Sequence, residues 1–389
     1  MKTVRVGLIG SGFIAALHMN AYRRVHGIEV EVRSVTSLDE DLSGFARRFD
    51  IPNTGRDWRA VLKDPEIDVI DICTPTVLHP EMTVSAMQAG KHVICEKPFT
   101  GYFGRPGDAT PIGEKVPKKL MYERAMAEMD AAVAAIRASG RLFCYGEDWV
   151  YMPAVAKTAE IVRATRDEIL FMKAEESHSG SHAAHASHWS SAGGGALMRL
   201  GIHPIGTVLW MKGIEARARG ETITVSGVSC DVGHVFRTLT AESRTYFGAR
   251  PADVEDWAML SLTFSDGTKA TIFGADTTLG GTRNLMETYT TGGALFANIE
   301  PNSHVVTYLT DEAKLAEVYI AEKVDRKTGW QFVCVDEDTT RGYTGEIQDF
   351  MECVVEGRQP RAGIDLAYEA VRVAYAGYWA AEEGRRISF

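Results

Sequence analysis

The chain has 389 residues, and its 52 acidic and 42 basic side chains give a formal net charge of −10 at pH 7. One hydrophobic core rarely serves a chain of this length, so we expect two domains. Hydrophobic residues make up 45% of the chain, which argues against global disorder. The acidic balance disfavours nucleic acid and anionic membrane surfaces as partners. The sequence has neither an apolar run of about 18 residues nor a signal-peptide pattern, which predicts a cytoplasmic protein.

The first 150 residues alternate between strand and helix patterns. Apolar runs that are typical of buried parallel strands lie at residues 4–9, 29–36, 67–73 and 92–95. A helical pattern at residues 13–25 follows the first of them. We therefore expect a doubly wound α/β domain that binds a dinucleotide over residues 1–150. Within it, glycine, proline and charge predict an exposed loop at residues 101–119, which could shape or gate a pocket.

The remainder, residues 151–389, has a different character. Alternating patterns that are typical of antiparallel strands lie at residues 221–228, 258–264 and 269–273. Helical patterns lie at residues 196–211, 343–355 and 365–383. We expect an α+β domain for substrate binding and oligomerisation, with helices on one face of an open, mostly antiparallel sheet. Its last helix, at residues 365–383, could pack back on the first domain.

A glycine-rich turn, Gly10-Ser11-Gly12-Phe13-Ile14-Ala15, stands between the first strand and the first helix and matches G-x-G-x-x-G/A. Gly10 permits the tight turn, Gly12 lets backbone amides approach a pyrophosphate, and Ala15 allows close packing. The helix N-terminus adds partial positive charge. The turn predicts a nicotinamide coenzyme here, with Phe13 and Ile14 beside it.

The second strand ends in Thr36-Ser37-Leu38-Asp39, where an acidic residue usually binds the adenosine ribose. Ser37 could accept either coenzyme. Asp39, Glu40 and Asp41 would repel the 2′-phosphate of NADP, so we expect NAD and keep NADP as the alternative.

Two further motifs follow buried strands: Thr74-Pro75-Thr76-Val77-Leu78-His79 and Ala89-Gly90-Lys91-His92-Val93-Ile94-Cys95-Glu96-Lys97-Pro98. Together with the glycine turn, they resemble the Gfo/Idh/MocA oxidoreductases, the family of glucose-fructose oxidoreductase and inositol dehydrogenase. The resemblance implies that Lys97 is catalytic and that Thr74, Pro75, His79 and Glu96 lie near the coenzyme. The place of Lys97 at the carboxyl end of a parallel strand supports that role independently. His79 could equally be a packing residue.

A histidine follows the triple glycine at residues 193–195 within the pattern at residues 196–211. In this segment the family usually has an aspartate, a histidine four residues later and another acid three residues after that. The corresponding residues here are Arg199, His203 and Gly206, so only the histidine is kept. His203 is the expected acid/base, since an imidazole can accept the substrate's hydroxyl proton near neutral pH. Arg199 could bind an anionic substrate, or it could pair with Glu175 or Glu176, which we favour.

Four histidines at positions 178, 182, 185 and 188 lie in a Ser-, Gly- and Ala-rich loop. Because supporting carboxylates are missing from the loop, we expect no metal. Substrate contact by His178 and His182 is the favoured interpretation, with a solvated loop as the alternative. Trp149 and Tyr151 are candidate walls for a sugar ring.

The combined hypothesis is a nicotinamide-dependent oxidoreductase that takes hydride from a secondary alcohol of a sugar, polyol or glycoside. Lys97 would stabilise the substrate oxygen and His203 would remove the proton. Two alternatives remain at this stage: an NAD-dependent glycosidase that uses transient oxidation, and a non-catalytic regulator that senses a dinucleotide. We also expect a homo-oligomer, a dimer or tetramer, that forms through the C-terminal sheet.

Overall fold

The computed structural model describes residues 2–181, 183–300, 305–313, 316–324 and 326–389. Its first sheet has six parallel strands in the order β3-β2-β1-β4-β5-β6. These strands are β1 (Lys2–Ile9), β2 (Ile28–Thr36), β3 (Asn53–Gly55), β4 (Val69–Ile72), β5 (His92–Glu96) and β6 (Phe143–Gly146). The central strands are buried because helices cover both faces, which explains their continuous apolar runs. The predicted doubly wound fold is confirmed.

The helices of this half are α1 (Phe13–Tyr22), α2 (Leu42–Phe49), α3 (Trp58–Leu62), η1 (Thr76–Leu78), α4 (His79–Gln88), α5 (Ile112–Lys115), α6 (Lys118–Ser139) and η2 (Asp148–Tyr151). Residues 101–119 are only in part the exposed loop that their composition predicted, since residues 105–107 and 109–111 are exposed but other parts of the segment are buried. Tyr102, Ile112 and Val116 are buried, and the Tyr102 backbone N–H donates to the hydroxyl of Tyr375. The apolar side chains among the glycines and prolines tie this segment to the core of the second half.

The second sheet has seven strands in the order β12-β11-β7-β10-β9-β8-β15. They are β7 (Ile169–Ser177), β8 (Val225–Gly233), β9 (Trp257–Phe264), β10 (Lys269–Ala275), β11 (Arg283–Thr290), β12 (Gly293–Asn298) and β15 (Ile387–Ser388). Only the β7–β10 pair among these neighbours is parallel, so the predicted mostly antiparallel sheet is confirmed. The strand expected to begin at residue 221 begins at Val225.

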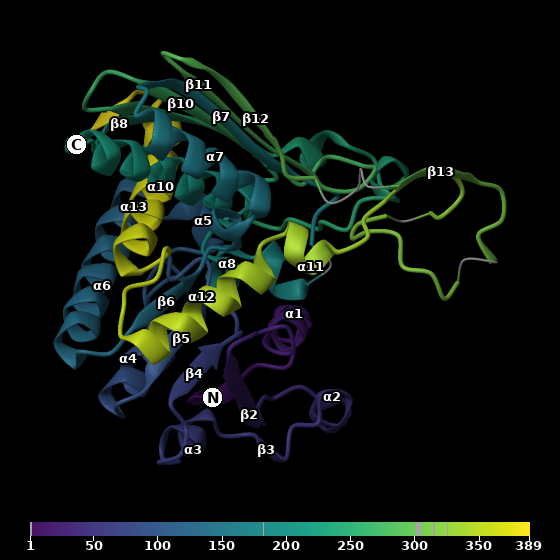
Figure 1. Cartoon of the computed structure of the whole chain (residues 1–389). Coiled ribbons are helices and arrows are strands. Elements are labelled where there is room, and N and C mark those ends of the chain that lie inside the picture. Colours follow the sequence, from purple (N-terminus) through teal and green to yellow (C-terminus); the bar gives the residue numbers. More distant parts are fainter. Residues whose placement is uncertain (1, 182, 301–304, 314–315, 325) are drawn as a thin grey trace.

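Helices α7 (Pro153–Thr165), α10 (Ile202–Arg219) and α13 (Ile364–Glu383) lie along one face of this sheet (Figure 1). The remaining short helices are η3 (Ala184–Ser187), α8 (Trp189–Ala192), α9 (Ala196–Arg199), η4 (Val235–Thr238), η5 (Glu242–Arg244) and α11 (Glu337–Thr340). The C-terminal segment returns to the first half, where α12 (Tyr343–Glu356) packs against α1 and α13 lies along α6. Within the described parts of the chain, no helix is long and apolar enough to cross a bilayer.

The helix predicted over residues 196–211 is wrong in one respect, because it breaks between α9 and α10. Pro204 has no backbone N–H and cannot bond to the carbonyl of Leu200. The chain therefore restarts a helix at Ile202, with Pro204 in its first turn, where a missing donor costs little. The break changes how Arg199 and His203 are presented, since they lie on two separate helices.

Beyond β12, the chain forms a two-stranded sheet of β13 (Val305–Leu309) and β14 (Gly329–Val333). This sheet projects from the body of the molecule (Figure 1).

Candidate active site

A cavity of about 950 Å³ runs from the turn after β1 to the face of α10. Its lining includes most of the predicted coenzyme contacts, namely Gly10, Gly12, Phe13, Ile14, Ser37, Thr74, Pro75, Glu96 and Lys97. Lys97, Glu176 and His203 line it as well. One cavity therefore joins the glycine turn to the lysine motif, although the two are far apart in the sequence.

The glycine turn has the shape that a pyrophosphate requires. Gly10 has φ +110°, and a Cβ there would lie 2.2 Å from the carbonyl oxygen of Cys73, so only glycine fits. No described atom lies within 4 Å of a Cβ built on Gly12, so its backbone is open to a ligand. Gly12 caps α1, whose first turn is apolar and whose N-terminus attracts an anion. These residues fit the diphosphate of NAD.

The adenosine end of the cavity is formed by Ser37, Asp39, Arg56 and Trp58. The Ser37 hydroxyl accepts hydrogen bonds from Ser11 Oγ at 2.9 Å and from the Asp39 N–H at 3.1 Å. The Arg56 guanidinium donates to the carbonyl oxygen of Leu38 at 3.3 Å. Sequence reasoning missed Arg56, which follows β3 and reaches this end because β3 pairs with β2.

At the other end, Lys97 follows β5, and its ammonium donates to the backbone carbonyl of Arg199 at 3.4 Å. His203 lies in the first turn of α10 and is 4% exposed. Its ring stacks on Trp149, with centroids 6.0 Å apart and planes at 9°. Lys97 and His203 therefore line the same part of the cavity, as the proposed chemistry requires.

The His203 ring nitrogens have different surroundings. Nδ1 lies 2.7 Å from Glu147 Oε1 and 3.1 Å from Asp148 Oδ1, whereas Nε2 lies 3.9 Å from Glu176 Oε2. A Cβ on Gly206 would lie 3.1 Å from Glu147 Oε2, so the missing side chain on α10 makes room for this carboxyl. The acid that contacts His203 thus comes from the end of β6 and not from the helix.

Burial governs the protonation of these groups. It raises the pKa of Glu147 well above its usual range, and the charge of Asp148 adds to the effect. Burial raises the pKa of Asp148 to about 7 and that of Glu176 to about 8. The pKa of His203 is lowered well below 6.5 by burial and then by the charge of Lys97. The short contacts of His203 are therefore hydrogen bonds within a proton-sharing group, not full ion pairs.

Arg199 lines the cavity, but its partner differs from the one expected. Its guanidinium pairs with Asp276, which follows β10 and is 1% exposed, and not with Glu175 or Glu176. Burial raises the pKa of Asp276, while the charge of Arg199 opposes that rise. The positive charge of Arg199 is thus balanced inside the protein.

Two predicted contacts lie outside the cavity wall. Tyr151 is buried in the core, where its hydroxyl donates to Asp349 at 2.9 Å, so it is not a substrate wall. His79 is 1% exposed and bridges the carbonyl oxygens of Thr74 and Pro98 at 2.8 and 2.9 Å. It holds two coenzyme-binding loops together and does not contact the coenzyme site itself. Trp149 lines the cavity as predicted.

The histidine loop divides into different environments. His178 is 8% exposed and lines the cavity with His185, so the start of this loop is packed and not solvated. Burial lowers the pKa of His178 well below its usual value. His182 was also predicted to contact substrate, but it lies outside the described residues. Segment 101–119 contributes no described residue to the wall of this cavity.

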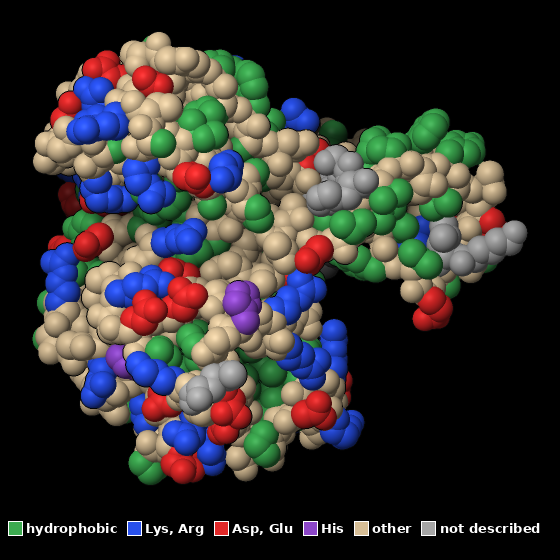
Figure 2. Space-filling view, viewed as in Figure 1, with side chains coloured by type: hydrophobic (Ala, Val, Ile, Leu, Met, Phe, Trp, Pro, Cys, Tyr) green, Lys and Arg blue, Asp and Glu red, His purple; other side chains and the backbone are tan. Residues whose placement is uncertain are grey.

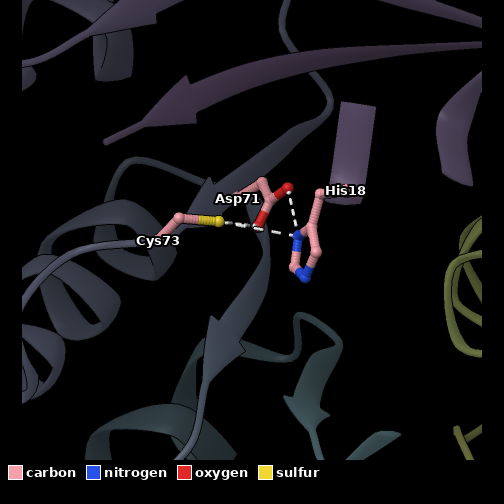
Figure 3. A group of neighbouring side chains, drawn as sticks. All are labelled: His18, Asp71 and Cys73. Atoms are coloured by element: carbon pink, nitrogen blue, oxygen red, sulfur yellow. Dashed lines mark hydrogen bonds and ion pairs between the residues drawn. The ribbon is translucent and has the colours of Figure 1, made fainter. Parts of the chain in front are cut away.

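A buried polar cluster supports the floor of the site (Figure 3). His18 Nδ1 lies 2.9 Å from Asp71 Oδ2, and Nε2 lies 3.1 Å from Glu96 Oε1. Burial lowers the pKa of His18, but the charges and hydrogen bonds of Asp71 and Cys73 together hold it well above its usual value. Cys73 Sγ completes the group at 3.6 Å from His18. The cluster connects α1 to the ends of β4 and β5, and so to the residue before Lys97.

Sequence reasoning missed this cluster and the roles of Glu147 and Asp148. A signal was present, since Asp71 interrupts an apolar strand and Glu147-Asp148 directly follows one. Ionisable residues at such positions are rarely buried without a partner. Asp276 carried the same signal, since it directly follows β10, whereas Arg341 of the cavity wall carried none.

Models of known families match most of the chain. Residues 4–119 match the oxidoreductase family with an NAD-binding Rossmann fold, and residues 167–296 match the GFO/IDH/MocA C-terminal domain. The chain is 42% identical to levoglucosan dehydrogenase of Pseudarthrobacter phenanthrenivorans over 106 residues, which are 25% of this chain and 27% of that protein. It is 28% identical to trans-1,2-dihydrobenzene-1,2-diol dehydrogenase of Bos taurus over 201 residues, 51% and 52% of the two chains. These matches span about a quarter and about half of the relatives' lengths.

Solved structures share the whole fold. GenD2 from gentamicin A biosynthesis, in complex with NAD, aligns with a TM-score of 0.80 at 21% identity and covers 100% of this chain and 97% of its own. Levoglucosan dehydrogenase in complex with NADH and levoglucosan aligns with a TM-score of 0.73 at 21% identity, covering 100% and 99%. At this identity the likeness shows the fold alone. Together with the two family models, the glycine turn and the lysine motif, it establishes that the chain belongs to the Gfo/Idh/MocA oxidoreductase family.

Proposed function

We propose that this protein is an NAD-dependent dehydrogenase that oxidises a secondary alcohol of a sugar or polyol. The observation that carries the proposal is the single cavity that contains the glycine turn, Lys97 and His203. Two of the relatives are named as dehydrogenases, one of levoglucosan and one of trans-1,2-dihydrobenzene-1,2-diol. Their names support the reaction class.

The residues of the cavity divide into two functional sets. Gly10, Gly12 and Ser37 would hold the diphosphate and adenosine ribose of NAD, and Asp39 disfavours a 2′-phosphate. When bound, NAD supplies the hydride acceptor. The ammonium of Lys97 would donate to the reacting oxygen and stabilise the negative charge that develops there. The hydroxyl proton of the substrate would pass to His203 Nε2, and the hydrogen on the same carbon would leave with its electron pair as hydride, so that a ketone forms.

Glu147 sets the protonation state in which His203 can act. While Glu147 keeps its proton, it donates to Nδ1 of His203, and the ring hydrogen of the imidazole lies on Nε2. In this form Nε2 has no free lone pair and cannot accept the substrate's proton. When Glu147 ionises, Nδ1 carries the hydrogen and donates to the carboxylate, and Nε2 becomes a base. Because burial raises the pKa of Glu147, the basic form gains population as the pH rises.

The polar lining fits a neutral, hydroxyl-rich substrate. Glu176, His178 and Asn284 offer groups that can hydrogen-bond to hydroxyls. Arg199 is balanced by Asp276, so an anionic substrate would find no excess charge from this arginine. Trp149 lines the cavity but is 1% exposed and stacks on His203, so it would orient this ring instead of offering a free face to a sugar.

We further propose that two domains meet near residue 150 and that the chain forms a homo-oligomer through its C-terminal sheet. The strands of the two sheets lie on either side of this position. The face of the seven-stranded sheet opposite the helices carries Met259 and Phe296, which are 45% and 68% exposed. Phe171 and Phe273 on the same face are half-buried. Such a surface favours a partner.

The experiment that tests the proposed function compares the parental protein with Lys97→Met. NADH formation is followed over polyols, neutral hexoses, sugar acids and glycosides, and NAD affinity is measured separately by fluorescence titration. We expect turnover with a neutral polyol or sugar and a loss of about 100-fold or more in Lys97→Met, as for loss of one charge-stabilising donor. If Lys97→Met still binds NAD, the loss of activity lies in the chemical step and not in coenzyme binding. Failure of the parental protein to bind NAD, or full activity of the variant, contradicts the proposal.

A further inference from the structure

The projecting segment between β12 and α11 presents a continuous apolar surface. We call residues 305–335 the arm; the structure describes 305–313, 316–324 and 326–335 of it. In its two strands, Val306 pairs with Phe332 and Tyr308 pairs with Trp330. Since side chains alternate along a strand, these four lie on one face of the arm. They are 50–66% exposed, and the rings of Tyr308 and Trp330 contact at 5.5 Å.

The concentration of apolar surface on the arm is unusual for a chain of this composition. Eight of the 20 exposed large hydrophobic side chains of the described residues belong to it. Figure 2 shows hydrophobic patches over the projecting part of the molecule. Besides the four of the paired face, they are Val305, Val318, Tyr319 and Val335. A monomeric soluble protein rarely exposes such a cluster.

The arm is packed on one face only, since Gln331, which lies opposite the paired face, is 6% exposed. Two-stranded sheets are marginally stable in water unless a third strand or another element packs on them. Among the described residues, the arm contacts the body through Arg326, which donates to the Tyr246 hydroxyl at 3.4 Å, and through Tyr319, whose hydroxyl donates to Glu337. The outer edges of β13 and β14 have no strand beside them among the described residues. A partner would stabilise both the face and the edges.

The paired face of the arm supplies part of what one side of a stable interface requires. Aromatic side chains bury about 150–250 Å² each, so the three half-exposed rings of this face present roughly 350 Å². A standard interface takes about 800 Å² from each partner. The arm therefore supplies about half of one side of an interface, and the rest must come from another surface of the same copy.

We propose that the arm packs on a second copy of this chain, against the outer face of its seven-stranded sheet. The arm follows β12, the edge strand of that sheet, in the chain and projects from the body as a separate two-stranded sheet, so it can reach beyond its own subunit. The outer face offers apolar counterparts in Phe171, Met259, Phe273 and Phe296. In a two-fold assembly, each copy contributes both surfaces, and both become covered.

The contact also reaches the active site. Glu322 and Lys323, at the root of the arm, line the coenzyme cavity, and Glu322 pairs with Arg341 of the cavity wall. This interface does not depend on the proposed reaction, because it is tested by the oligomeric state of the protein and not by its activity.

The test uses the full-length protein and the double variant Tyr308→Asp/Trp330→Asp, which charges the paired face without touching the buried root. Light scattering coupled to size exclusion gives the mass. Ile161→Asp, an exposed apolar residue on α7, is the matched control. We expect the parental protein and the control to be oligomers and the double variant to fall to a smaller species. Unchanged circular dichroism and NAD binding would show that it is folded.

A photo-crosslinking amino acid at position 330 tests the docking site. We expect a crosslink between two copies that maps to peptides of β7–β12. A monomeric parental protein, a folded double variant with unchanged mass, or crosslinks that map elsewhere would each overturn the proposal. Loss of oligomerisation with NAD binding and turnover retained would leave the proposed function intact, so the two ideas fail separately.

Discussion

Replacement of Glu147 by glutamine tests the arrangement around the proposed base most directly. Glutamine keeps the size of the side chain but cannot carry the charge that stabilises the Nδ1 hydrogen at 2.7 Å. Hydrogen bonds to charged groups contribute about 1.5–3 kcal/mol. We therefore expect kcat/KM for alcohol oxidation to fall by about 10- to 150-fold. The affinity for NAD should stay unchanged, since Glu147 does not line the coenzyme cavity.

The pH dependence separates this role from a structural one. Burial raises the pKa of Glu147, so the carboxylate, and with it the basic form of His203, is gained as the pH rises through that value. Parental kcat/KM for oxidation should therefore climb as the pH rises through the raised pKa of Glu147, and Glu147→Gln should flatten that climb. Initial rates of NADH formation over this range give both profiles. An identical profile and rate in the variant would refute the reasoning.

A second variant controls for disturbed packing. Because a Cβ on Gly206 would lie 3.1 Å from Glu147 Oε2, an acid at position 206 can reach the same space once Glu147 is shortened. We expect Glu147→Ala to lose activity and Glu147→Ala/Gly206→Asp to regain part of it. Gly206→Asp in the parental background should be harmful, since two carboxyls would then compete for one site. Rescue of the double variant would show that a carboxyl beside His203, and not Glu147 as such, is needed.

Three further outcomes are expected. Gly10→Ala would place a methyl group 2.2 Å from the Cys73 carbonyl at φ +110°, so NAD binding and the melting temperature should both fall; normal NAD affinity would contradict this. Arg199→Met leaves Asp276 buried without its cation and should cost about 2–4 kcal/mol in denaturant unfolding, whereas unchanged stability would mean that the pair is dispensable. Burial raises the pKa of Glu176 to about 8, so this acid is protonated at pH 7. Glu176→Gln should accordingly keep kcat/KM within about threefold at pH 7 and alter the profile only at higher pH, and a large loss at pH 7 would contradict the protonated state.

The parts of the site that sequence predicted are those that local geometry determines. A strand, a glycine turn and a helix are consecutive in the chain, so the roles of Gly10 and Gly12 follow from the order of residues alone. The position of Lys97 follows in the same way from the strand that precedes it. Pro204 could also have shown the break before α10, since a proline is tolerated only in the first turn of a helix.

The partners of these residues could not be predicted, because they come from distant segments. Glu147 and His203 are 56 positions apart, and Arg199 and Asp276 are 77 positions apart. Tyr151 was predicted to contact substrate but lies in the core, because the sequence does not show whether an aromatic residue at a domain junction lines a cavity or packs inside. Only the packing of α12 and η2 placed it inside.

The amino-acid sequence by itself determined the family, the Rossmann half and the two residues proposed for catalysis, because strand periodicity, turn chemistry and short motifs act between neighbours in the chain. The tertiary structure alone decided which carboxyl contacts His203, which acid neutralises Arg199 and how the arm is exposed. Those features depend on burial and on the approach of side chains from separate strands and helices. Burial also sets the protonation of the acids around His203, since the free energy of a charge depends on how much water surrounds it.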